Sequence, residues 1–298
     1  MPQTFAFVNG RQIPEQDVRI GLDDFGFIRG NTVFELARVY GEHPFELTAH
    51  LDRLEASLRL CHIPQRFTRQ ELKAQISALI RTHKFADSVI KIYVTQGATK
   101  ATGYSLGITA TSCDPQLIVL NQPFTPFSAD YPYHERYYKE GLKLASLHAE
   151  RPLAAAKTTS YIQATAASSE HLADGMDDIL YINSHGCVTE SSRSNIFFTR
   201  GAHIITPAHG MLDGITRRVV LDILTELNIP AEVRDVPLTE LPKMDGGFTT
   251  ASTTEIVPVQ SVDTIRWQAD NALIQRIRTA FAARVAACRG AGTSLKTA

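Results

Sequence analysis

Residues 189–217, TESSRSNIFFTRGAHIITPAHGMLDGITR, contain two short apolar runs followed by a helical pattern. The runs, Ile196–Thr199 and Ile204–Thr206, are separated by a glycine and predict a β-hairpin. Gly214 then directly precedes a helix that begins near Ile215. The first N–H groups of a helix have no partner within it, and the helix dipole favours negative charge there. This stretch therefore predicts a strand pair that leads into an anion-binding helix start.

Upstream, the stretch LAAAKTTSY (Leu153–Tyr161) places Lys157 among small, uncharged side chains. A lysine that loses part of its hydration becomes a usable amine nucleophile and base. Such lysines form Schiff bases with carbonyl compounds, pyridoxal phosphate among them. The alternative interpretation is a lysine on the exposed edge of an Ala-rich helix.

Other polar stretches match the groups of pyridoxal phosphate, which carries a phosphate dianion and a pyridine nitrogen. Glu190 lies among hydroxyl residues just before a predicted strand, where a carboxylate could keep the ring nitrogen protonated. Arg53, in AHLDRL, supplies forked donors that suit phosphate, and Thr249–Glu255 (TTASTTE) is a hydroxyl-rich turn. Taken singly, each stretch also fits an ordinary turn, loop or surface arginine.

In their order and spacing, these stretches resemble the class IV aminotransferases, which are the fold-type IV pyridoxal phosphate enzymes. That family includes branched-chain and D-amino-acid aminotransferases, (R)-selective amine transaminases and aminodeoxychorismate lyase. The most specific match runs from Glu190 to Arg217, and the resemblance extends from the N-terminal hairpin to about Val262.

The resemblance assigns roles to individual positions of this chain. It implies that Lys157 is the Schiff-base lysine and that Glu190 is the partner of the pyridine nitrogen. The residues that it implies for the phosphate are Arg53, Ile215, Thr216 and Ser252, and Tyr161 lies near a family tyrosine or asparagine that follows the lysine. No metal ligand is implied.

Around the substrate, the chain departs from each of its relatives. Gln96 stands where D-amino-acid aminotransferases carry an arginine, and Phe34 stands where they carry a tyrosine. Tyr93 stands about where branched-chain aminotransferases use an arginine, and Gly103–Ser105 is similar to the lyase without its preceding arginine. The candidate substrate residues are therefore Phe34, Tyr93, Gln96, Lys100, Arg193 and Ala251.

These departures leave three functions open. The segment GNTVFE (Gly30–Glu35) favours an aminotransferase that moves an amino group between an amino acid and a 2-oxo acid. The second reading is a 4-amino-4-deoxychorismate lyase, which expels pyruvate and yields p-aminobenzoate. A non-catalytic binding protein that kept the fold is the third.

The resemblance also implies an α+β fold with a small N-terminal α/β domain and a larger C-terminal pseudo-barrel domain. The cofactor would lie in the cleft between them, and a homodimer would complete each site. We expect the small domain over residues 1–120, an inter-domain connection over 121–137, the larger domain over 138–290 and a loose tail over 291–298.

Sequence periodicity predicts the elements of these domains. Asn9-Gly10 predicts a hairpin turn, and residues 21–31 read as a loop. Strands are expected at 32–40, 89–95, 108–112, 116–120, 142–146, 179–182, 196–199, 204–206, 231–236, 247–251 and 256–262. Helices are expected on the leucine stripe that starts at Leu47, after a Thr68/Glu71 capping box, over 161–173, from Ile215, and on a final stripe from Leu273 to Val285.

Composition excludes several other classes of protein. In 298 residues, 30 Lys and Arg balance 31 Asp and Glu, so no net field attracts nucleic acid or anionic membrane. No apolar run approaches membrane-spanning length. The four cysteines are scattered, which argues against a metal site or a disulfide framework and fits a reducing cytoplasm.

Overall fold

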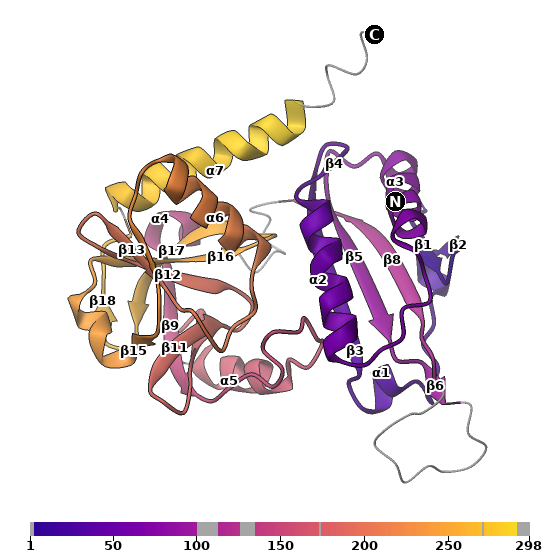
Figure 1. Cartoon of the computed structure of the whole chain (residues 1–298), viewed down its shortest axis with the longest axis horizontal. Coiled ribbons are helices and arrows are strands. Elements are labelled where there is room, and N and C mark those ends of the chain that lie inside the picture. Colours follow the sequence, from indigo (N-terminus) through magenta and orange to yellow (C-terminus); the bar gives the residue numbers. More distant parts are fainter. Residues whose placement is uncertain (1–2, 100–112, 126–134, 173, 270, 291–298) are drawn as a thin grey trace. The chain divides into compact units, whose positions relative to one another are not determined.

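The computed structural model describes residues 3–99, 113–125, 135–172, 174–269 and 271–290 (Figure 1). The chain divides into two compact units. Unit 1 comprises residues 1–124, 156–160 and 289–298, and unit 2 comprises residues 125–155 and 161–288. The expected strand at 108–112, Lys100, Gly103–Ser105 and the tail lie outside the described residues.

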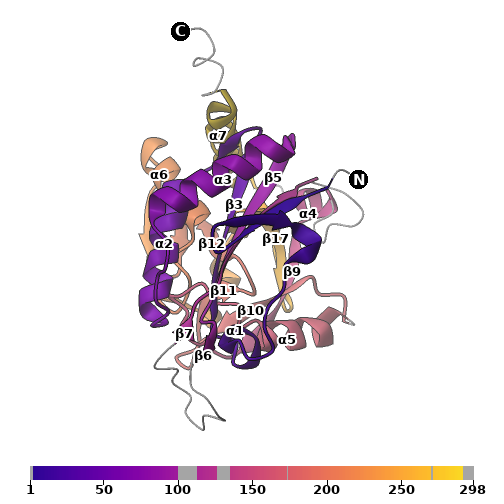
Figure 2. The same ribbon diagram turned by 90° about the vertical axis from the view of Figure 1, so that its right-hand side faces the viewer.

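Unit 1 is an antiparallel sheet with two helices on one face (Figures 1 and 2). Its strand order is β2-β1-β8-β5-β3-β4, and a two-stranded sheet pairs β6 with β7. The strands are β1 (Phe5–Val8), β2 (Arg11–Pro14), β3 (Thr32–Tyr40), β4 (His43–Pro44), β5 (Asp87–Thr95), β6 (Ala98–Thr99), β7 (Cys113–Asp114) and β8 (Leu117–Pro123). The helices are η1 (Glu15–Asp17), α1 (Phe25–Ile28), α2 (Leu47–Leu60) and α3 (Arg69–His83).

The two long helices of unit 1 form for the reasons that the sequence indicates. The stripe of α2 buries Leu51, Leu54 and Leu58 against β3 and β5. The predicted capping box at the start of α3 is confirmed, because Thr68 Oγ1 accepts from the Glu71 N–H and the Glu71 carboxylate accepts from the Thr68 N–H.

Two predictions for unit 1 were wrong in detail. Residues 21–31, expected as a loop, contain the single-turn helix α1, because Asp24 caps it by accepting from the Gly26 N–H at 2.6 Å. The strand predicted at 116–120 extends to Pro123, because residues 121–123 pair with Ser88–Ile90 of β5. The domain boundaries stay predictions.

Unit 2 contains a ten-stranded sheet that includes a closed ring (Figure 2). The path is β14-β13-β12-β16-β17-β9-β10-β11-β15, and an additional pairing joins β11 to β12. The strands are β9 (Leu142–His148), β10 (Asp178–Ile182), β11 (Cys187–Ser191), β12 (Asn195–Arg200), β13 (His203–Thr206), β14 (Ala231–Val233), β15 (Val236–Pro237), β16 (Gly246–Ala251), β17 (Glu255–Val262) and β18 (Ile265–Arg266). The helices are α4 (Glu135–Glu140), α5 (Ile162–Leu172), α6 (Ile215–Glu226), η2 (Leu238–Lys243) and α7 (Ala272–Gly290).

The ring is the barrel-like core of unit 2, and its closure lies at the functional stretch. Glu190 of β11 pairs in register with Asn195 of β12, which closes the ring of β12, β16, β17, β9, β10 and β11. The predicted hairpin is confirmed, since β12 and β13 pair antiparallel. The predicted α+β fold with a barrel-like second half is therefore confirmed. The sequence did not predict which strands close the ring, because that pairing depends on long-range register.

Candidate active site

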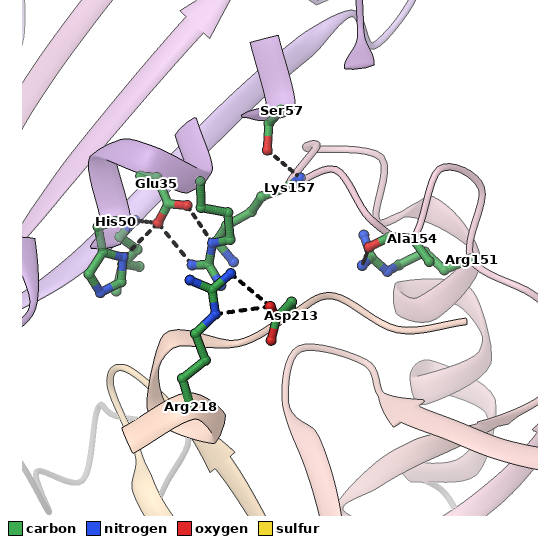
Figure 3. Close-up of polar contacts among 10 residues, drawn as sticks. Glu35, His50, Ser57, Arg151, Ala154, Lys157, Asp213 and Arg218 are labelled. Carbon is green, nitrogen blue, oxygen red and sulfur yellow. Dashed lines mark hydrogen bonds and ion pairs between the residues drawn. The ribbon is translucent and has the colours of Figure 1, made fainter. Parts of the chain in front are cut away.

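In unit 1, the segment that carries Lys157 runs beside β3 rather than forming an Ala-rich helix. The Lys157 N–H donates to Ser57 Oγ at 3.1 Å (Figure 3). The Lys157 carbonyl accepts from the Phe34 N–H at 2.9 Å. Thr158 forms a β-bridge with Val33. The alternative of a lysine on an exposed helix edge is therefore wrong, because backbone hydrogen bonds hold this segment in an extended form against the sheet.

The side chain of Lys157 lies over an aromatic pair. Its Nζ is 4.4 Å from the centroid of the Phe34 ring, and that ring stacks on Tyr93 at 5.9 Å. Burial raises the pKa of the Tyr93 hydroxyl, so Tyr93 is a neutral hydrogen-bonding group at physiological pH. Two of the candidate substrate residues are thus brought together with the lysine.

Gln96 has a structural partner at the end of β5. Its Oε1 accepts from Asn31 Nδ2 at 2.6 Å, and its N–H donates to the Asn31 carbonyl. Nearby, Asp24 accepts from Thr95 Oγ1 and from the Gly97 N–H. These contacts join the segment that contains α1 to the end of β5, so Gln96 helps to hold that segment in place.

Arg53 is part of a buried charged cluster on α2 and β3. Its Nε and Nη2 donate to Glu35 Oε1 and Oε2 at 2.7 and 3.0 Å, and His50 Nδ1 lies 2.8 Å from Glu35 Oε2 (Figure 3). Burial would raise the pKa of Glu35, but Arg53 and His50 together hold it well below its usual range. Burial lowers the pKa of His50, and the charges of Arg53 and Lys157 act in the same direction. The cluster therefore contains a carboxylate, a guanidinium and a neutral imidazole.

In unit 2, Glu190 is buried and held by two donors. Arg151 Nε lies 2.8 Å from Glu190 Oε1, and the Leu212 N–H donates to Oε2 at 3.2 Å. Arg151 Nη2 also donates to the Ala154 carbonyl at 2.6 Å, which fixes the guanidinium. The carboxylate is thus oriented by its surroundings, as a partner for a protonated ring nitrogen must be.

The start of α6 has the features of an anion site. Its N-cap, Gly214, provides no side-chain hydrogen bond, and Ile215 and Thr216 are both buried. Asn195 Nδ2 donates to the Leu212 carbonyl at 2.6 Å, which ties the incoming loop to the ring. A Cβ at Gly214 would overlap with Asn195 Oδ1, so a larger residue at this position would displace the Asn195 side chain.

The hydroxyl-rich turn follows β16, the strand that pairs with β12. Ser252 lies half-buried in the turn, directly after Ala251. Among the described residues, Thr250 Oγ1 and Thr254 Oγ1 are buried and have no hydrogen-bond partner. Unpartnered buried hydroxyls are costly, and phosphate oxygens would satisfy them. The residues of unit 2 therefore fit a phosphate-bearing group.

Tyr161 and Arg193 lie elsewhere in unit 2, where they line one cavity of about 360 Å³ together with Asp178. Burial raises the pKa of Asp178, while hydrogen bonds from Ser192 and the charge of Arg193 oppose that shift. The structure thus associates Arg193 with a buried carboxylate. The predicted substrate role of Arg193 and the predicted cofactor-binding role of Tyr161 stay predictions.

Other features of the described residues bear on function. No three of the described His, Cys, Asp and Glu side chains come together in a way that would hold a metal ion. Within the described part of the chain, every helix is too short or too polar to cross a membrane.

Each unit has groups of the kind that enzymes use for a phosphate-bearing aldehyde cofactor: a lysine beside a sheet and a buried arginine in unit 1, and an uncapped helix start and buried hydroxyls in unit 2. The family model for amino-transferase class IV matches residues 32–262 of this chain. The chain therefore belongs to the class IV aminotransferases, which are pyridoxal 5′-phosphate enzymes.

Similar proteins carry several activities in their names. D-alanine aminotransferase of Listeria innocua is 26% identical over 265 residues, which cover 88% of each chain. Aminodeoxychorismate lyase of Bacillus subtilis is 26% identical over 268 residues, which cover 88% of this chain and 87% of the lyase. The branched-chain aminotransferase of Thermobaculum terrenum, solved in its pyridoxal phosphate form, matches with a TM-score of 0.81 and 25% identity over 95% of this chain and 94% of that one.

Sequence reasoning missed the residues that support the predicted ones. Glu35 pairs with both Arg53 and His50, and Arg151 holds Glu190. Asn195 lies beside Gly214 at the start of α6, and Thr254 of the hydroxyl-rich turn has a buried hydroxyl without a partner. The H-x-x-R spacing in α2 was visible and would place His50 and Arg53 on one helix face. No local pattern marks the others.

Proposed function

We propose that this class IV aminotransferase transfers an amino group from an amino acid to a 2-oxo acid, with Lys157 as the Schiff-base lysine. The observation that supports this proposal most is the position of the Lys157 side chain and the way its backbone is held. Its Nζ lies over the Phe34 ring, and its backbone is held on both sides by β3 and α2. A lysine fixed in this way, beside an aromatic wall, has the partial desolvation that an amine nucleophile needs.

Each group then has a defined task. Lys157 Nζ serves as nucleophile and as the base that removes and returns the proton on the carbon next to the substrate nitrogen. Glu190 keeps a proton on the ring nitrogen, and Arg53, Ile215, Thr216 and Ser252 hold the phosphate. The cofactor supplies an electron sink for the bond that breaks. Phe34 and Tyr93 exclude water beside the lysine, and Tyr93 offers a neutral hydroxyl to the substrate.

Two further properties belong to the proposal. A homodimer is supported by four exposed apolar side chains of unit 1 that are close in sequence, Ile20, Leu22, Phe27 and Ile28. A cytoplasmic location is supported by the four cysteines, which are scattered along the sequence and form no paired motif. Light scattering should give twice the chain mass, and a monomer at every concentration would contradict the dimer.

A second candidate is the lyase reaction, because the aminodeoxychorismate lyase of Bacillus subtilis is as similar to this chain as the D-alanine aminotransferase. The products distinguish the two reactions. A lyase would release pyruvate and p-aminobenzoate, whereas an aminotransferase would pass the amino group of its substrate to a 2-oxo acid.

The test is a substrate panel with the purified holoenzyme. L- and D-amino acids are offered with 2-oxoglutarate or pyruvate, and aminodeoxychorismate is offered separately. We expect the new amino acid to form from at least one pair of substrates. Release of p-aminobenzoate with no amino transfer in any pair would contradict the proposal and establish the second candidate.

A further inference from the structure

Glu35 is the most completely buried charged residue among those near Lys157. Its exposed fraction is 0%, and both carboxylate oxygens accept from Arg53, in the fork geometry that arginine forms with carboxylates. His50 Nδ1 contacts the same carboxylate at 2.8 Å. The pairs cross from β3 to α2, so they are tertiary contacts and not features of one element.

Packing alone does not explain this cluster. The apolar face of α2 already has Leu51, Leu54 and Leu58 in the core of unit 1. Well-packed apolar residues often stabilise a protein as much as a buried ion pair does, because both charges lose their hydration. What the pair adds is orientation, since the fork fixes the plane of the guanidinium and its rotation about the side-chain axis.

Orientation matters for a long side chain such as Arg53. An unpaired arginine has several rotatable bonds and loses about 2 kcal/mol of rotamer entropy when it is fixed. With the Nε and Nη2 edge held by Glu35, that entropy is already lost before any ligand arrives. A ligand that binds the guanidinium therefore meets a preorganised donor.

We propose that Glu35, supported by His50, is a positioning residue that holds Arg53 for the cofactor phosphate. This inference rests on the proposed function, in which Arg53 binds that phosphate. Glu35 itself contacts Arg53 and not the phosphate, so its effect appears only through the arginine. The negative charge of Glu35 opposes phosphate binding, but the fixed direction of the donors outweighs that opposition because charge-assisted hydrogen bonds need alignment.

The experiment compares two cofactors that differ only in the phosphate. Dissociation constants of pyridoxal 5′-phosphate and of pyridoxal are measured from the absorbance of the bound cofactor, in wild type and in Glu35→Gln. Carboxylates that orient metal ligands change affinity by about 10–100-fold, and we expect a loss of about 10-fold for the phosphate form. Pyridoxal binding is expected to stay at the wild-type value. An unchanged ratio of the two constants would overturn the inference.

Two controls show whether the effect passes through Arg53. Glu55→Gln removes another carboxylate of α2, which pairs with the half-exposed Arg69, and is expected to leave both constants unchanged. In an Arg53→Met background, Glu35→Gln is expected to have no further effect on phosphate selectivity. If Glu35→Gln lowered phosphate selectivity in the Arg53→Met background as much as it does in the wild type, Glu35 would not act through Arg53.

If Glu35→Gln does not fold, His50→Gln tests the inference in its place. This variant keeps the forked pair between Glu35 and Arg53 and removes only the imidazole contact. We expect a smaller loss of phosphate selectivity in the same direction, and an unchanged selectivity would overturn the inference. If the wild type binds neither form, the proposed function fails instead, so the two failures are distinguishable.

Discussion

The two units offer different kinds of donor for an anion: a fully charged group in unit 1 and partially charged groups in unit 2. In unit 1, Arg53 carries a full charge and is neutralised by the buried Glu35. In unit 2, the start of α6 and the hydroxyls of Thr250 and Thr254 offer partial charges, and those hydroxyls have no partner among the described residues. The cost of burying an unpaired charge is far larger than that of an unpaired hydroxyl. A buried cation therefore needs a counter-ion before its ligand arrives, whereas hydroxyls can remain unpaired.

The largest effect is expected where the counter-ion is removed. Glu35→Gln leaves Arg53 buried without its charge partner, and breaking a buried pair in this way costs about 3–5 kcal/mol. Denaturant unfolding of the apoprotein measures the loss. Glu55→Gln, in the half-exposed pair with Arg69, is expected to change the free energy of unfolding much less. Equal effects of the two substitutions would remove the distinction between the buried pair and the half-exposed one.

In unit 2, the largest effect is expected at the start of α6. Gly214→Ala places a methyl group against Asn195 Oδ1 and should cost about 1–3 kcal/mol, because the neighbouring groups must move. The affinity for pyridoxal 5′-phosphate should fall as well. Adding Asn195→Ala makes room, so the double variant is expected to lose less than the sum of the two single ones. If the losses in the free energy of unfolding were additive, the contact between the new methyl group and Asn195 would not be the cause of the Gly214→Ala loss.

The pH dependence of stability tests the neutral member of the unit 1 cluster. Because burial lowers the pKa of His50, the unfolded chain binds a proton below about pH 6.5 that the folded chain does not. The contribution of neutral His50 to the free energy of unfolding is fully present above that pH and is lost as the pH falls toward the pKa of His50 in the folded protein. The slope from this residue is at most about 1.4 kcal/mol per pH unit. His50→Gln should flatten the decline between pH 7 and 5, and an identical slope would contradict this account.

The smallest effect is expected from an unpaired hydroxyl of unit 2. Thr254→Val replaces a buried, unpartnered oxygen by a methyl group of similar size, so apoprotein stability should rise by about 1 kcal/mol. The affinity for pyridoxal 5′-phosphate should fall at the same time. Thr253→Val, which removes the half-buried hydroxyl of the neighbouring residue, is the control and is not expected to stabilise the protein. A loss of apoprotein stability in Thr254→Val would contradict the interpretation.

Local patterns in the sequence predicted most elements but not their partners. The leucine stripe of α2, the capping box of α3 and the hairpin of β12 and β13 depend on neighbours within a few residues, and all three are confirmed. The ion pairs that surround the candidate site join residues 18 and 39 positions apart, Glu35 to Arg53 and Arg151 to Glu190. Such pairs follow from sheet register and leave no periodic signal.

The resemblance supplied what local patterns could not. It identified Lys157 and Glu190 as candidates, although the local sequence alone favoured an exposed lysine and a turn glutamate. It could not identify Thr254 or Asn195, because a hydroxyl or an amide in a polar turn is common. Their significance appears only when burial and hydrogen bonding are known.

The central claim, that Lys157 forms the Schiff base, can be tested by one labelling measurement. The holoenzyme is reduced with borohydride, which converts the Schiff base into a stable amine, and the digested peptides are examined by mass spectrometry. We predict a phosphopyridoxyl group on the peptide that contains Lys157, and no such label in Lys157→Ala. Labelling of a different lysine in the wild type, or of none, would contradict the claim.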